Sequence, residues 1–275
     1  MKPFIKWAGG KNRFAERIVS ILGKECNNYF EPFIGSGAVL LQMNPKKAYC
    51  SDVNAELINL YQIVKDNPKE LIMELYNNFI PFHNEEFYYK IRSWDRENDY
   101  FTRYNSIRRA ARFIYLNKAC YNGIWRVNQS GQNNVPFGKN LTPTFLQDNI
   151  IYEAHDFFVQ RNVVFFVSDY KDIVKKARRG DVVYFDPPYD KDEGQSSFLE
   201  YNQSTFGREE QMNLKKICDR LVARGVRVGV SNSGTSFIRD LYNGYKIESF
   251  DVNRTIGGTR ESRHVYKEVF IYNRE

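Results

Sequence analysis

Cysteine, histidine and long apolar runs are scarce in this chain of 275 residues. The cysteines are widely spaced: Cys26, Cys50, Cys120 and Cys218. Because none belongs to a C-x-x-C pair and the histidines are isolated, we expect no metal site. No run approaches the ~20 apolar residues of a membrane span, and the start, MKPFIKWAGGKNRF, lacks the apolar centre of a secretory signal. These absences predict a soluble, cytoplasmic protein without disulfides.

Positive charge and aromatic side chains are abundant instead. The formal net charge is +7 and aromatic residues make up 16% of the chain, a combination that suits a polyanionic partner with stackable bases. Hydrophobic residues reach 42%, too many for a disordered chain. The length fits one large domain, or a core domain with a sizeable insertion.

Residues 1–53 and 162–275 alternate between strand-like and helix-like patterns. The expected strands are 28–33, 47–52, 162–167, 181–186, 226–231, 245–252 and 265–273. The expected helices are 11–22, 36–43, 54–66, 169–178, 207–224 and 234–242. Such alternation is typical of a mostly parallel sheet covered on both faces. We therefore expect the two segments to form one α/β domain around a seven-stranded sheet.

The segment 54–161 contains little that resembles a strand. Further helices are expected at 68–79, 84–93 and 103–120. The last has an apolar stripe at helical spacing, formed by Ile107, Ala110, Ala111 and Ile114. Three arginines lie largely off that stripe, on a face that we expect to be solvated: Arg108, Arg109 and Arg112. A polar loop, 121–142, follows, and loops of that length in compact domains are usually functional. We interpret the segment as a helical insertion that carries a recognition loop.

The stretch DVVYFDPPYDK, residues 181–191, raises a functional question. Its apolar and aromatic run predicts a strand, which the prolines end, and Asp-Pro is ordinary turn chemistry, so a purely structural role is an equally good interpretation. In the functional interpretation the prolines hold the Asp186 carboxylate and the Pro187 carbonyl at the end of a strand, where open α/β sheets bind ligands. These two acceptors suit a flat amino group. Tyr189 offers a ring on which adenine or cytosine could stack.

Two other strand ends carry weaker signals. In YFEPFIGSGAVLL (29–41), Gly35 and Gly37 permit a close approach to a ligand, although a plain turn would use them too. In AYCSDVNAELINLY (48–61), Asp52 could bind the hydroxyls of a ribose or cap the next helix. Together, the three strand ends predict a nucleoside cofactor beside a base. Because Leu40 stands where the dinucleotide fingerprint has its third glycine, S-adenosyl-L-methionine is a better candidate than NAD.

Seven motifs follow one another in a specific order. They are FIKWAGGKNR (4–13), EPFIGSG (31–37), SDVNAELINLY (51–61), YLNKACYNGIWRVN (115–128), NVPFGK (134–139), DPPY (186–189) and SNS (231–233). With them the chain resembles, over nearly its whole length, the Dam-type DNA adenine-N6 methyltransferases, which methylate GATC. The resemblance implies a Rossmann-like methyltransferase sheet with an inserted helical DNA-recognition domain. DPPY alone is less specific, since related tetrapeptides occur in enzymes that act on cytosine, RNA and glutamine.

The resemblance also implies roles around the cofactor, S-adenosyl-L-methionine. In this family the W-A-G-G-K segment folds back against the cofactor, which gives Trp7 and Lys11 cofactor roles. The pocket residues that it implies are Phe33, Gly35, Gly37, Asp52 on the ribose hydroxyls and Asp186 where cofactor and target meet. From the sequence alone, Phe185 either packs on the cofactor's adenine or is a buried strand residue.

The loop 121–139 is implied to read duplex DNA. Tyr121 matches an aromatic residue that wedges into the duplex as the target base leaves. Asn122 matches a residue that supports the distorted backbone. Arg126 matches a base-reading arginine, which is chemically apt because a guanidinium can be bidentate to guanine O6 and N7.

Three further residues complete the implied DNA contacts. Pro136 would touch a thymine methyl group, and Lys6 matches a lysine that contacts the outer guanine. Lys139 stands where some relatives carry arginine, so the bidentate fork is missing there.

The expected reaction is methyl transfer to adenine N6 in duplex DNA after the base has left the helix. Asp186, Pro187 and Tyr189 would be the catalytic residues. Three alternatives stay open: an RNA adenine methyltransferase, a DNA-binding protein on a catalytically idle scaffold, and a cytosine-N4 enzyme. The sequence also leaves open whether the protein acts beside a cognate restriction endonuclease that cuts the same site.

Overall fold

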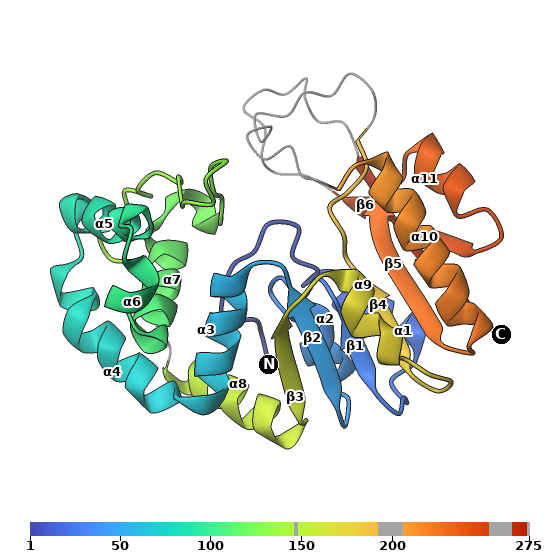
Figure 1. Cartoon of the computed structure of the whole chain (residues 1–275), viewed down its shortest axis with the longest axis horizontal. Coiled ribbons are helices and arrows are strands. Elements are labelled where there is room, and N and C mark those ends of the chain that lie inside the picture. Colours follow the sequence, from blue (N-terminus) through green and yellow to red (C-terminus); the bar gives the residue numbers. More distant parts are fainter. Residues whose placement is uncertain (146–147, 192–205, 253–265, 274–275) are drawn as a thin grey trace.

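The computed structural model describes residues 1–145, 148–191, 206–252 and 266–273. A seven-stranded sheet occupies one side of the molecule, and a group of helices occupies the other (Figure 1). The strands are β1 (Tyr29–Glu31), β2 (Ala48–Asp52), β3 (Val163–Val167), β4 (Val182–Phe185), β5 (Arg227–Ser233), β6 (Lys246–Val252) and β7 (Tyr266–Tyr272). Each expected strand is present within one or two residues of its expected bounds.

The strand order is β3-β2-β1-β4-β5-β7-β6. Strands β3, β2, β1, β4 and β5 are parallel, whereas β7 runs antiparallel to both of its neighbours, β5 and β6. The expectation of a mostly parallel α/β sheet is therefore confirmed. Because parallel strands point their carboxyl ends to one edge, the loops after β1, β2, β3 and β4 meet there.

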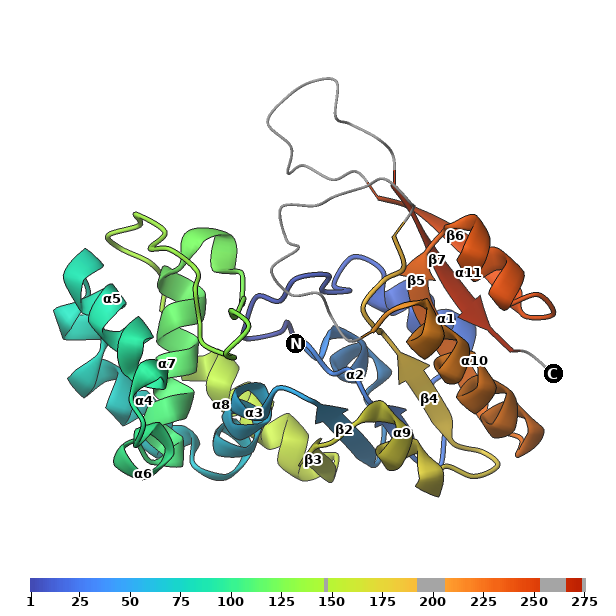
Figure 2. The same cartoon turned by 45° about the horizontal axis from the view of Figure 1, so that its top comes forward.

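Alternate strand residues supply two separate apolar cores, as the pleat requires. Tyr29, Val182 and Tyr184 lie in one core, while Phe30 and Val183 lie in the other. Helices α1 (Ala15–Leu22) and α2 (Ala38–Met43) cover the first face. Helices α9 (Tyr170–Ile173), α10 (Arg208–Ala223) and α11 (Ser236–Leu241) cover the second (Figure 2). Both faces are buried, so the central strands are continuous apolar runs.

The helical side contains α3 (Ala55–Asp66), α4 (Pro68–Asn78), α5 (Glu85–Arg92), α6 (Tyr100–Arg103), α7 (Ser106–Ala119) and α8 (Asp148–Gln160). Helix α3 packs against β2 and β3 as well as against α7, so it joins the helices to the sheet. Our expectations did not include α8. Its buried residues Ile151, Ala154 and Phe158 do follow helical spacing, so the signal was present in the sequence.

The expectation that all three arginines of α7 face solvent is wrong. Arg112 is only 1% exposed; its Nη2 lies 2.8 Å from Asp95 Oδ2, and its Nε donates to the Ile91 carbonyl at 2.9 Å. Arg109 pairs with Glu56 at 2.5 Å. The reason is that α7 contacts α3, α4 and α5 and so has no broad free face. The buried charge of Arg112 is tolerated because the guanidinium has both an acid and carbonyl acceptors.

No helix in the described ranges is long and apolar enough to cross a membrane.

Candidate active site

The turn after β1 requires its glycines. Gly35 and Gly37 have φ of 47° and 69°, a backbone region that residues other than glycine rarely adopt. A Cβ on Gly35 would lie 2.8 Å from Cδ1 of Trp7, so the indole packs directly on the turn. The N-terminal segment is thereby held against the carboxyl edge of the sheet.

Asp52, at the end of β2, turns toward this loop. Its Oδ2 accepts from the Gly35 amide at 3.4 Å, and its Oδ1 accepts from the Asn54 amide at 3.0 Å. Burial raises the pKa of Asp52, and the amide hydrogen bonds partly oppose this. The helix cap is Asn54, which accepts from Leu57 N at 3.1 Å. Asp52 is therefore not needed as the helix cap, and it lines the cavity described below.

Asp186, directly after β4, is paired with Lys11 across the cavity. Lys11 Nζ lies 2.9 Å from Asp186 Oδ2, and the lysine is 5% exposed. The other oxygen, Oδ1, is buried and has no hydrogen-bond partner. Burial raises the pKa of Asp186, Lys11 opposes that shift, and the negative charge of Glu268 adds to it. A buried acceptor without a donor is unusual in a folded protein and needs an explanation.

Tyr189 lies on the same side of the cavity. The Lys11 ammonium is 4.9 Å from the centre of its ring, and its hydroxyl donates to Glu268 Oε2 at 3.3 Å. Glu268 belongs to β7, so the strand that runs against the others supplies an acid to the site. The phenol is thus oriented by two groups that are distant in sequence.

Two buried amide side chains hold the loop that contains Tyr189. Gln211 Nε2 donates to the Pro188 carbonyl at 2.8 Å, and Asn232 Nδ2 donates to Gln211 Oε1 at 3.0 Å. The Asp190 amide donates in turn to Asn232 Oδ1 at 3.1 Å. Gln211 and Asn232 are 1% and 0% exposed. We call this series of hydrogen bonds the amide clamp; it fixes the backbone on both sides of Tyr189.

These strand ends surround a cavity of about 730 Å³. Its walls include most of the residues that the sequence predicted for cofactor and catalysis: Trp7, Lys11, Phe33, Gly35, Asp52, Asp186, Pro187 and Tyr189. Gly37 is not among the described lining residues; a Cβ there would lie 3.1 Å from the Tyr61 hydroxyl. Phe185 is completely buried within the sheet and does not line the cavity, which favours its interpretation as a strand residue. A cavity of this size suits a nucleoside-sized ligand.

Several cavity residues were absent from our prediction: Asp169, Tyr170, Phe206, Glu210 and Glu268. Asp169 could have been found, because it follows β3 and precedes a helix just as Asp52 follows β2. Phe33 and Tyr170 stack with ring centres 5.3 Å apart and form an aromatic wall. Glu268 gave no local signal, because only the sheet brings β7 beside β5.

The predicted DNA-contact residues group on the helical side. Lys6 is joined to that side by Asn117, whose Oδ1 accepts from the Lys6 amide at 3.0 Å and whose Nδ2 donates to the Lys6 carbonyl at 2.8 Å. Tyr121 is 56% exposed, and its amide donates to the Pro136 carbonyl at 3.0 Å. Asn122 is exposed and has φ of 57°. Lys6, Tyr121, Asn122 and Pro136 therefore lie on one surface.

Arg126 and Lys139 belong to the same loop. Arg126 Nε donates to Asn134 Oδ1 at 2.7 Å, so its guanidinium is oriented by a residue further along the same loop. Lys139 is exposed and has φ of 57°, next to Gly138, whose amide donates to the Ala119 carbonyl at 2.9 Å. Asn117 and Asn134, which position Lys6 and Arg126, were not among our predicted residues.

A cavity at the carboxyl edge of a mostly parallel α/β sheet is where this class of fold binds its ligands. The chain belongs to the family described as D12 class N6 adenine-specific DNA methyltransferase, which it matches over residues 7–256. It is therefore a DNA adenine methyltransferase.

Individual relatives are similar over almost the whole chain. A Type II methyltransferase of Lactococcus lactis subsp. cremoris, M1.LlaDCHI, is 35% identical over 99% of this chain and 95% of its own length. The Type II methyltransferase M.MjaIII of Methanocaldococcus jannaschii is 35% identical over 99% of both chains. The DNA adenine methylase of Escherichia coli strain K12 is 36% identical over 94% of this chain and 92% of its own.

Proposed function

We propose that this enzyme transfers the methyl group of S-adenosyl-L-methionine to adenine N6 within GATC in duplex DNA, after flipping the adenine out of the helix. The observation that carries the proposal is the unpaired, buried Oδ1 of Asp186, in a cavity that Pro187 and Tyr189 also line. An adenine amino group has two N–H donors, and Oδ1 and the Pro187 carbonyl would satisfy both.

The residues around the cavity fit the proposed cofactor. S-adenosyl-L-methionine supplies an electrophilic methyl group on a nucleoside carrier. Asp52 offers carboxylate oxygens to the ribose hydroxyls, and Gly35 lines the cavity beside it. Phe33 and Tyr170 offer an aromatic wall to the adenine ring. Trp7 would cover the cofactor from the N-terminal side.

The chain's own groups prepare the target nitrogen. Lys11 neutralises one oxygen of Asp186 and so keeps the buried carboxylate charged, ready to accept from N6 through the other oxygen. Tyr189 stacks on the flipped base. Hydrogen bonds from N6 to Asp186 and to the Pro187 carbonyl draw its lone pair out of conjugation. As the nitrogen gains its methyl group it becomes acidic, and Asp186 takes the proton and passes it to water. Positioning and fixed charge supply most of the acceleration.

The helical segment 54–161 is proposed to bind and read the DNA. Exposed Tyr121 would fill the space that the flipped base leaves, which offsets an unstacking cost of a few kcal/mol. Arg126 would read a guanine and Pro136 a thymine methyl group. Lys6 and Asn122 share that surface and would contact the outer guanine and the backbone, with Lys139 beside them.

One digestion experiment tests base and site together. Plasmid DNA without adenine methylation is incubated with the enzyme and S-adenosyl-L-methionine, then cut with two nucleases specific for GATC. We expect resistance to the nuclease that adenine methylation blocks, and cleavage by the one that requires it. Methyl label that enters DNA without either change would overturn the GATC assignment and leave the chemistry intact. Absence of label with this cofactor would overturn the proposed cofactor.

The biological role that we propose is protection of the site from a cognate restriction endonuclease, without direct contact between the two proteins. It is supported by the Type II names of the Lactococcus and Methanocaldococcus relatives. Cleavage of unmethylated GATC by the product of a neighbouring gene would support this role, and its absence would favour a replication or repair mark.

A further inference from the structure

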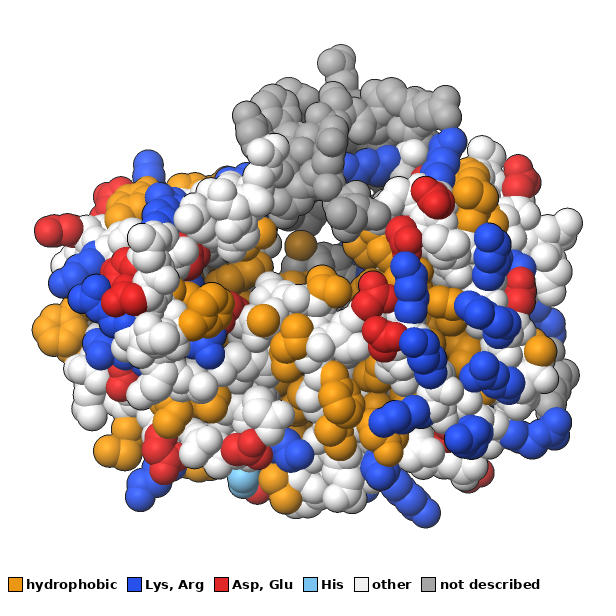
Figure 3. All heavy atoms as spheres, viewed as in Figure 1, with side chains coloured by type: hydrophobic (Ala, Val, Ile, Leu, Met, Phe, Trp, Pro, Cys, Tyr) orange, Lys and Arg blue, Asp and Glu red, His pale blue; other side chains and the backbone are white. Residues whose placement is uncertain are grey.

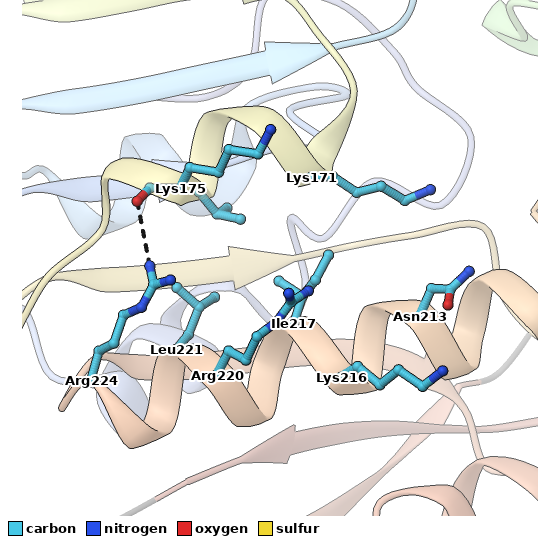
Figure 4. Close-up of a pocket in the computed structure, with 9 residues that line it drawn as sticks. Lys171, Lys175, Asn213, Lys216, Ile217, Arg220, Leu221 and Arg224 are labelled. Atoms are coloured by element: carbon cyan, nitrogen blue, oxygen red, sulfur yellow. Dashed lines mark hydrogen bonds between the residues drawn. The ribbon is translucent and has the colours of Figure 1, made fainter.

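A second basic surface lies outside the active site, along α10. Lys216 and Arg220 lie on this helix and Arg224 is its C-cap residue; the three are spaced four residues apart, and all are exposed. Figure 4 shows them on the side of α10 that borders a groove. No ion pair joins Lys216 or Arg220 to an acid within the described residues. Arg224 donates to the Lys175 carbonyl at 3.4 Å.

The opposite wall of the groove is also basic. Lys171 lies in α9 and Lys175 in the 3-10 turn that continues it, again four residues apart. The floor between the two walls is aliphatic: Val174, Ile217 and Leu221. The groove encloses about 360 Å³, and no acid is among its described lining residues. Glu210 and Asp172, just outside it, pair with Lys171 and Lys175 at 2.9 and 2.6 Å.

The cations of α10 are unfavourable in the isolated protein. Like charges four residues apart on a helix repel one another, and neither Lys216 nor Arg220 is offset by an ion pair within the described residues, whereas Lys171 and Lys175 are. The helix dipole favours cations in the last turn of α10, which accounts for Arg220 and Arg224. It does not account for Lys216 in the middle of the helix. Figure 3 shows Lys and Arg side chains gathered over α9 and α10, whereas both signs are mixed on the helical side.

We propose that this groove binds the phosphodiester backbone of a DNA segment outside the methylated site. The proposal rests on the enzyme acting on duplex DNA. Lys171 and Glu210 line the active-site cavity, and Lys171 lines the groove as well, so the two are adjacent. The lining offers rows of cations and almost no group that could read a base. Its one amide, Asn213, donates to Glu210 at 3.2 Å. Such a surface recognises phosphate without sequence preference.

The test compares two triple variants that lose the same charge. K216Q/R220Q/R224Q removes the cations of α10, and K24Q/K46Q/K69Q removes three exposed lysines elsewhere. Affinity is measured at several salt concentrations for a duplex of about 60 base pairs without GATC, and methylation is measured on a duplex of about 12 base pairs around GATC. Because the α10 residues do not touch the active site, methylation of the short duplex also reports correct folding.

We expect the α10 variant to bind the long duplex at least tenfold more weakly than the control variant. The slope of log affinity against log salt should fall by about two to three, one for each lost phosphate contact. Methylation of the short duplex should be unchanged. Equal binding by the two variants, equal losses on both duplexes, or a loss seen for RNA and free phosphate but not for DNA would each overturn the proposal. Failure of the wild-type enzyme to methylate the short duplex would instead count against the proposed function.

Discussion

At the scale of single residues, the ion pair of Lys11 and Asp186 decides what a substitution would do. Lys11 is 5% exposed and hydrogen-bonds the Gly9 carbonyl in addition to the Asp186 carboxylate. Removing the acid leaves a buried ammonium without a counter-charge, which is more harmful than an absent pair. The pair is therefore both a structural contact and the means of keeping Asp186 ionised.

Asp186→Ala should abolish turnover and leave DNA binding largely intact. Asp186 supplies an acceptor to the target nitrogen, but the proposed DNA contacts lie on the helical side. We expect kcat to fall by about a thousandfold or more, the scale seen when one charge-stabilising group is removed. Single-turnover methylation and equilibrium DNA binding measure the two effects separately. Because the alanine substitution leaves Lys11 without its partner, Asp186→Asn serves as the isosteric control. Full turnover in either variant would refute the proposed role.

Glu268 should set the acid side of the pH profile. Its negative charge raises the pKa of Asp186, beyond the larger effect of burial. In Glu268→Gln that contribution disappears, so the Asp186 pKa falls and the acid limb of kcat/KM moves to lower pH. Glu210→Gln is the matched control, since Glu210 lines the same cavity but pairs with Lys171. An acid limb that stays in place, or moves equally in both variants, would contradict this assignment.

At the scale of elements, the amide clamp links α10 and β5 to the loop after β4. Gln211→Ala removes the donor to the Pro188 carbonyl and leaves Asn232 without its acceptor. We expect a drop in kcat of about ten- to a hundredfold with KM for DNA little changed, because the loop loses its fixed position. Gln211→Glu can accept from Asn232 but cannot donate to Pro188. A loss in the alanine variant with full activity in the glutamate variant would contradict the clamp.

In the recognition loop, a contact to a base can be distinguished from a contact to the phosphate backbone. Arg126→Ala should lose about 1–3 kcal/mol of discrimination at one guanine, because a bidentate contact to the base is removed. Asn134→Ala is the companion variant, since Asn134 orients the guanidinium at 2.7 Å. It should show a smaller loss at the same position. Methylation rates on oligonucleotides with single base changes measure both. Equal losses on all sequences would make Arg126 a phosphate contact.

Elements whose signals are local could be predicted from the sequence, and their partners could not. The strand ends at Asp52 and Asp186 follow from short apolar runs and from proline and glycine chemistry. The position of Lys6 depends on Asn117, which is 111 residues away, and that of Tyr189 depends on Glu268, which is 79 residues away. No local pattern encodes such contacts. Helix α8 differs, because its buried residues Ile151, Ala154 and Phe158 have helical spacing and so carry a local signal.

At the scale of the whole molecule, the two cores join the helical segment to the sheet unequally. One core runs from α1 and α2 through α3 into α7, and the other is confined to the face under α9, α10 and α11. The alternation of strands and helices predicted a sheet with two covered faces. It did not predict that β7 lies between β5 and β6, because pairing between distant strands is set by the folded chain.

A carboxyl group beside the first core couples the stability of the molecule to pH. Glu31 is 2% exposed and accepts from the Tyr29 hydroxyl at 2.9 Å. Burial raises its pKa to about 8; the Tyr29 hydrogen bond opposes the shift, and the charge of Asp186 adds to it. In the unfolded chain the group ionises near its ordinary value of 4.5. The native state thus holds the extra proton between these values, and its stability falls as pH rises through that window.

Glu31→Gln should remove this pH dependence, because glutamine stays neutral and can still accept from Tyr29. The free energy of unfolding of the variant, relative to wild type, should increase from pH 5 to pH 8.5 by several kcal/mol, at about 1.4 kcal/mol for each pKa unit. Denaturant unfolding at the two pH values measures it. The other titrating groups are common to both proteins and largely cancel in the difference. A difference that is constant with pH would mean that the pKa of Glu31 in the native protein stays near its ordinary value, and would contradict this prediction.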